Sequence, residues 1–224
     1  MGRPKIGYHL DGAPVVGVTT VLRQKDSIGL IQGANAVGRR GKRVYSTKAE
    51  IGEWSRSASI GSCAHDRIEA AIRGVEPDLS DYTEEIQALS IPPFESFKRW
   101  AVGKTLNGQT EVPLVHRDLR FGGTIDYIDR ETNTLYDWKT SGSLDYRDDL
   151  YGQVAGGYLL LCEQENIKID RCIVVRFPKE GTDAEFLTVD VPSTIATQAK
   201  SMFLGLLAAY NARLVLNAKG DVPY

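Results

Sequence analysis

The chain has 224 residues, of which 42% are hydrophobic and 25% are charged, and its formal net charge is −2. These values are typical of one globular domain and exclude a protein that coats nucleic acid by bulk positive charge, although a cleft with local positive potential stays compatible with them. The three cysteines lack Cys-x-x-Cys spacing, so we expect neither structural disulfides nor a zinc site. No segment has the length and apolarity of a membrane span, and no apolar signal segment follows the N-terminus. We therefore expect a cytoplasmic protein without membrane contact.

The first 56 residues are expected to form a hairpin followed by helical pieces. Residues 8–16 have Asp11-Gly12 at their centre, as in a short β-hairpin. Within 27–49 every charged residue is basic, and a local excess of this kind in an acidic protein is a candidate contact for nucleic-acid phosphates. The residues selected for that contact are Arg39, Arg40, Lys42 and Arg43. A solvated basic run explains the same pattern equally well.

The rest of the chain alternates helical and strand patterns. Residues 57–73 have helical apolar spacing and end at Gly74, and residues 81–104 favour two helices separated at Pro92-Pro93. The strands that we then expect span roughly 111–118, 120–130, 134–140, 169–177 and 185–190, with a helix at about 147–164 and a last helix after Pro192. The last helix carries an apolar stripe that should face the core.

Residues 123–140, which read GTIDYIDRETNTLYDWKT, are the most informative segment. Side chains two positions apart share one face of a strand, so Asp137 and Lys139 project together while Trp138 points the other way. The polar residues 130–133 suit a tight reversal that places Asp126 opposite position 137 or 139. Two carboxylates about 4 Å apart repel by about 4 kcal/mol at an effective dielectric constant of about 20, and Mg²⁺ or Mn²⁺ would cancel that repulsion. The alternative is an edge hairpin with a solvated Asp–Lys pair.

The order of four motifs resembles the PD-(D/E)XK nuclease superfamily. These motifs are Gly-x-x-x-His on a helix, then Gly-Thr-Ile-Asp, then Asp-Trp-Lys-Thr, and then a helix that begins near a glutamine. The chain is most similar to the RecB-like branch, which includes phage exonucleases and mitochondrial genome maintenance exonucleases, and the resemblance runs from Tyr8 to about Leu161. It implies an α/β, restriction-endonuclease-like core in which helices flank a central mixed β-sheet, with a helical N-terminal region.

The resemblance also implies a role for individual residues. The metal ligands that it implies are His65, Asp126, Asp137 and the backbone carbonyl of Trp138. Lys139 matches the catalytic lysine, which acts with Asp126 and Asp137, and Glu111 matches a supporting acid.

A helical Gln-x-x-x-Tyr motif of the family is matched only in part. Gln153 matches its glutamine, which contacts the substrate or holds the lysine, so we count it among the catalytic and substrate-binding residues. The tyrosine position is occupied by Gly157, and Tyr158 follows one residue later. One residue turns a side chain by about 100° around an α-helix, so Tyr158 reaches the usual substrate-side contact only if the helix carries a local bulge.

The expected function is a metal-dependent DNA exonuclease that hydrolyses phosphodiester bonds with Mg²⁺ or Mn²⁺. One domain would span residues 1–224, with a substrate-guiding region at 1–56 and the catalytic core at 57–224. The family setting is DNA recombination, repair or replication in a bacterial or phage-infected cytoplasm, with DNA and a recombination protein as partners, and it leaves the oligomeric state open. The alternatives are a structure-selective or single-strand endonuclease, a non-catalytic DNA-binding module, and a protein unrelated to nucleic acid.

Overall fold

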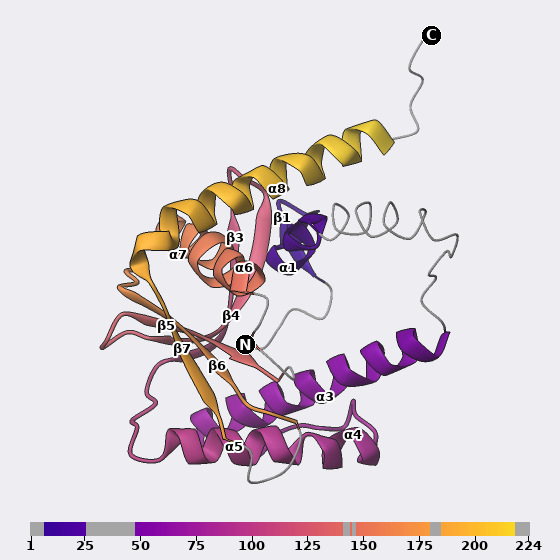
Figure 1. The fold of residues 1–224 in the computed structure, drawn as a ribbon, viewed down its shortest axis with the longest axis vertical. Helices are drawn as coiled ribbons and strands as arrows, with labels where there is room; N and C mark the ends of the chain where they lie inside the picture. The colour runs from indigo at the N-terminus through magenta and orange to yellow at the C-terminus, as the bar shows by residue number, and fades with distance from the viewer. Residues whose placement is uncertain (1–6, 26–47, 141–143, 145–146, 180–184, 218–224) are drawn as a thin grey trace, which may run out of the picture.

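A computed structural model gives the fold of residues 7–25, 48–140, 144, 147–179 and 185–217 (Figure 1). A seven-stranded mixed sheet lies at its centre, in the order β1-β2-β4-β5-β6-β7, with β3 paired to β4. The strands are β1 Tyr8–Leu10, β2 Ala13–Gly17, β3 Gln109–His116, β4 Phe121–Asp129, β5 Thr134–Lys139, β6 Arg171–Arg176 and β7 Leu187–Val191. The β2–β4 and β5–β6 pairs are parallel and the other pairs are antiparallel.

Helices cover the sheet in two groups (Figure 1). The first group consists of α1 Val18–Leu22, α6 Arg147–Tyr151, the π-helix η1 Gly152–Tyr158, α7 Leu159–Gln164 and α8 Ala196–Asn217, which the 3₁₀ turn η2 Ser193–Ile195 precedes. The second group consists of α3 Lys48–Arg73, α4 Glu84–Leu89 and α5 Ile91–Ala101. The predicted fold class, a mixed sheet flanked by helices, is therefore confirmed. Within the described residues, no helix combines the length and the apolar character needed to cross a membrane.

Each helical group packs on the sheet through its own apolar cluster. Phe121 and Phe203 are fully buried in the first cluster, where α8 meets β4 with ring centroids 4.8 Å apart. Trp100 and Trp138 belong to the second cluster, with ring centroids 5.2 Å apart. Burying a large apolar side chain contributes about 1.5–3 kcal/mol, so these clusters fix the position of β5 between the helical groups.

The boundaries of three predicted helices differ from the observed ones. The helix predicted from Ser57 begins at Lys48, so the proposed division at residues 56 and 57 falls inside α3. The two helices predicted in 81–104 are present, but they meet at Ser90, and Pro92 and Pro93 occupy the first turn of α5, where the missing proline N–H has no intrahelical partner to lose. The helix predicted over 147–164 is a continuous helical run, but its centre is a π-helix.

The apolar stripe predicted for the last helix does face the core. Ala199, Phe203 and Leu207 of α8 are buried in the first cluster.

Candidate active site

The β4–β5 hairpin brings two aspartates together. The two strands are antiparallel with Tyr127 opposite Tyr136, and continuing that register by one residue places Asp126 opposite Asp137. This is the first of the two registers that the sequence allowed. The Asp129 carboxylate accepts hydrogen bonds from two backbone N–H groups of the turn, at 2.9 and 3.3 Å, which explains why the chain reverses there.

Asp126 lies in the part of β4 that pairs with neither β2 nor β5, the two strands along one edge of β4. β3 pairs with β4 from residue 121 to 128, so β2 and β5 share the other edge. β2 pairs with residues 121 and 122 and β5 with residues 127 to 129, which leaves 123–126 between them. There the backbone N–H of Trp138 donates a hydrogen bond to Asp126 Oδ2 at 2.7 Å. This bond fixes the orientation of the buried carboxylate.

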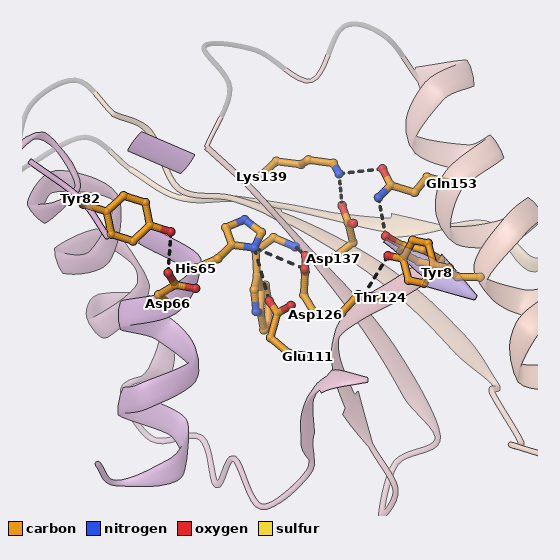
Figure 2. A network of polar contacts seen from close by, with 12 residues as sticks. Tyr8, His65, Asp66, Tyr82, Glu111, Thr124, Asp126, Asp137, Lys139 and Gln153 are labelled. Atoms are coloured by element: carbon orange, nitrogen blue, oxygen red, sulfur yellow. Dashed lines mark hydrogen bonds and ion pairs between the residues drawn. The ribbon is translucent and has the colours of Figure 1, made fainter. Parts of the chain in front are cut away.

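His65, Glu111 and Asp126 form a buried cluster from three separate elements (Figure 2). One ligand atom from each lies within 4.8 Å of the others. His65 Nδ1 is 3.3 Å from Asp126 Oδ1 and 3.9 Å from Glu111 Oε1. An imidazole nitrogen and two carboxylates are donors that divalent cations accept, and an ion would offset the repulsion between the two acids. The cluster therefore fits a divalent metal ion.

The approach of α3 to the sheet depends on Gly61, one turn before His65. A Cβ atom at Gly61 would lie 2.8 Å from Thr140 Oγ1, which is closer than ordinary packing allows. The glycine therefore lets α3 lie close to the end of β5 and lets His65 reach Asp126.

Glu111 has a more central place than the supporting role that we predicted for it. It has a φ of 44°, in the left-handed region that non-glycine residues rarely adopt. Backbone strain of this kind costs about 1–3 kcal/mol and is found most often at functional sites. The β3–β4 register, continued between Thr110–Tyr127 and Val112–Ile125, places Glu111 opposite Asp126, and no local pattern in the sequence specifies this pairing.

Asp137, in contrast, does not belong to the three-residue cluster and lies beside Lys139. Lys139 Nζ is 2.6 Å from Asp137 Oδ2, an ion pair that lacks hydrogen-bond geometry, so this buried oxygen has no hydrogen-bond partner among the described residues. Burial raises the pKa of Asp137, the Lys139 ammonium opposes that rise, and the nearby Asp126 carboxylate adds to it. A carboxylate in these surroundings favours a further cation.

A hydrogen-bonded chain holds Lys139 from the other side (Figure 2). Lys139 Nζ donates to Gln153 Oε1 at 2.8 Å, and Gln153 Nε2 donates to the Tyr158 hydroxyl at 2.7 Å. Gln153 and Tyr158 are buried, so these bonds are shielded from water.

The π-helix η1 makes this chain of bonds possible. A π-helix bonds residues five apart, and Gln153 and Tyr158 are five apart, so both reach the same side of the helix. The bulge that would be needed to realign Tyr158 is therefore present. At Gly156 a Cβ atom would lie 2.8 Å from the carbonyl oxygen of Ala199, so η1 and α8 pack with their backbones close together.

One pocket of about 700 Å³ contains side chains from both groups of residues, although Asp126 and Glu111 of the cluster are not among its lining residues. His65, Lys139, Gln153 and Tyr158 line it, together with the basic residues Arg23 and Lys179. None of the described residues that line it is an aspartate or a glutamate. The pocket therefore suits an anionic ligand.

The remaining predicted site residues are Trp138 and four basic residues, and their places relative to this pocket differ. Trp138 lines it, but its ring packs in the aromatic cluster, and the contact that fixes Asp126 comes from its N–H; metal binding by its carbonyl stays a prediction. The four basic residues proposed for phosphate contact lie outside the described residues: Arg39, Arg40, Lys42 and Arg43.

No protein-family model and no curated protein matches this chain. Among solved structures, it is similar to a protein from Eubacterium rectale provisionally named an exonuclease, with 16% identity over 79% of this chain and 73% of that chain and a TM-score of 0.40. It is also similar to LHK-Exo, solved in complex with dAMP, with 15% identity over 73% of this chain and 91% of that chain and a TM-score of 0.32. Both likenesses are distant, and the proposed function depends on the residues of the site.

Proposed function

We propose that this protein is a metal-dependent deoxyribonuclease that hydrolyses phosphodiester bonds at strand ends. The observation that carries the proposal is that one pocket is lined both by His65, which belongs to a buried cluster able to bind a divalent cation, and by Lys139, which is held between Asp137 and Gln153. Phosphodiester hydrolysis needs a stabilised phosphate charge and a positioned water, and these two groups are suited to those tasks.

The cation would be held by His65, Glu111 and Asp126, with Asp137 and the Trp138 carbonyl as the further ligands that the sequence predicts. When bound, it would supply a Lewis acid and lower the pKa of a coordinated water. All other tasks fall to side chains of the chain itself.

Lys139 has the central task among those side chains. Its ammonium lies beside Asp137, where it orients the attacking water or neutralises charge that develops on the phosphate oxygens. Gln153 limits the positions that the lysine can adopt, and Tyr158 fixes the amide of Gln153. Both are positioning residues in this mechanism.

The DNA specificity and the preference for strand ends come from the family resemblance. The basic residues before α3 would follow the phosphates of the entering strand, and the setting would be DNA recombination, repair or replication in a bacterial or phage-infected cytoplasm. A recombination protein as partner belongs to the same family setting.

The test is digestion of end-labelled single- and double-stranded DNA with Mg²⁺, Mn²⁺ or EDTA. We expect hydrolysis with a divalent metal only, and a loss of about 10²–10⁴-fold in Lys139→Ala. Lys98→Ala is the matched control, because Lys98 lies on α5 and pairs with Glu95 at the protein surface. Wild-type activity in Lys139→Ala would contradict the mechanism.

Two further outcomes separate the alternatives. Rapid cleavage of a covalently closed single-stranded circle would refute end-dependence and favour an endonuclease. DNA binding without turnover in either metal would favour a non-catalytic module.

A further inference from the structure

A second lysine, Lys179, lines the pocket that contains His65 and Lys139. Lys179 follows β6, the parallel neighbour of β5. In this pair Lys139 lies opposite Arg176, and the N–H of Phe177 donates a hydrogen bond to the Lys139 carbonyl oxygen at 2.7 Å. The carboxyl ends of adjacent parallel strands meet at one edge of a sheet, and ligands commonly bind at such an edge. The fold therefore places both lysines at the carboxyl ends of these two adjacent strands.

The Lys179 ammonium is held by Ser57 of α3. Lys179 Nζ donates to the carbonyl oxygen and to the hydroxyl oxygen of Ser57, both at 2.7 Å. Neutral oxygens satisfy two of its three N–H donors and leave its charge uncompensated.

Other lysines with described side chains have a partner that compensates their charge. Those with a carboxylate partner are Lys25, Lys98, Lys139, Lys168 and Lys200. Lys104 lies over the Trp100 ring, 5.1 Å from its centroid. Within the described part of the chain, Lys179 has neither kind of partner.

The surroundings of Lys179 favour an anion. Burial lowers the pKa of Lys179, because the charged form loses hydration in the pocket wall. The pocket has hydroxyl groups of Ser57, Ser62 and Thr140 along α3 and the end of β5, and none of its described lining residues is acidic. Ammonium and hydroxyl donors together suit the oxygens of a phosphate group.

We propose that Lys179 binds a phosphate of the nucleic-acid strand in this pocket, separate from the phosphodiester that Lys139 serves. This inference rests on the proposed nuclease function, since it takes a polynucleotide as the ligand. Lys179 would act in binding and would leave the chemical step to the residues around Lys139.

The test uses Lys179→Met, which retains the apolar stem and removes the charge. Binding of a fluorescent single-stranded oligonucleotide is measured by anisotropy in EDTA, over a series of salt concentrations. We expect the Kd to rise about tenfold and the slope of log Kd against log salt concentration to fall by about 0.7, as for one lost phosphate contact. Lys168→Met is the matched control, because Lys168 precedes β6 at the other end of that strand and pairs with Asp170.

A charge-retaining variant tests whether the charge of Lys179 is what binding requires, and a second charge-removing variant guards against misfolding. Lys179→Arg keeps the charge and should retain both the Kd and the slope of the wild type. Thermal unfolding checks the fold, and Lys179→Gln replaces the methionine variant if that variant does not fold. A charge-removing variant with the same Kd and slope as Lys168→Met would overturn the inference.

Steady-state hydrolysis distinguishes this inference from the proposed function. For an active enzyme, we expect Lys179→Met to raise KM with kcat within about twofold of the wild type, and a fall in kcat at constant KM would overturn a binding role. If the wild type hydrolyses no DNA, the proposed function fails while anisotropy still decides whether Lys179 binds phosphate.

Discussion

Replacing Tyr158 by phenylalanine tests whether the π-helix positions Lys139. The substitution removes one hydroxyl, which accepts the hydrogen bond of Gln153 Nε2 at 2.7 Å. Because Gln153 is buried, an N–H that loses this acceptor costs about 1–3 kcal/mol. The protein can respond in two ways, and each has its own measurable result.

If the Gln153 amide stays in place, the cost appears as lower stability. For a protein of this size the melting temperature should fall by about 2–4 °C for each kcal/mol, while kcat is retained. If the amide turns to find another acceptor, stability is retained, but Oε1 leaves Lys139 and kcat should fall about tenfold, the equivalent of about 1.4 kcal/mol.

The assay therefore combines thermal unfolding with the rate of hydrolysis of end-labelled DNA. Tyr210→Phe is the control, because Tyr210 of α8 makes no hydrogen bond among the described residues. An unchanged melting temperature together with an unchanged kcat in Tyr158→Phe would refute a positioning role for this tyrosine.

Two further predictions concern the metal cluster and the buried thiols. Glu111→Gln should weaken Mn²⁺ binding at least about tenfold, measured by titration calorimetry without DNA, because it removes one of two carboxylates beside His65. Glu69→Gln is the control, because Glu69 lies on the same helix as His65. Equal Mn²⁺ affinities of the two variants would exclude Glu111 as a ligand. Burial raises the pKa of Cys162 and of Cys172 to about 12, so at pH 8 only about one thiol in 10⁴ is ionised in the folded protein. Iodoacetamide should therefore modify these two cysteines at the rate of unfolding, and fast modification of the folded protein would contradict their burial.

The fold was largely predictable because strong local signals coincide with the final structure. The hairpin between Asp126 and Asp137 has apolar, β-branched runs on both sides of a polar turn, and the observed register is one of the two that this pattern allows. The apolar stripe of the last helix likewise predicts which side chains α8 buries. Such patterns are local, so a single sequence contains them.

The details of the site were less predictable because they depend on contacts between distant segments. Glu111 joins His65 and Asp126 only after β3 has paired with β4 and α3 has packed nearby. Lys179 enters the pocket through the parallel pairing of β5 with β6, which no local pattern specifies. The start of α3 at Lys48 was also missed, because the glycine at position 52 weakens the helical pattern there.

The seven residues of η1 also bear on how the spacing of helical residues is read from a sequence. In η1 one extra residue is absorbed within a single turn, while α6 before it and α7 after it remain regular α-helices. Counting four residues from Gln153 leads to a glycine and suggests a lost contact, but the hydroxyl of Tyr158 is already in place. Side-chain direction, not the number of residues between them, decides whether Gln153 and Tyr158 meet, and a count of four residues misses that contact.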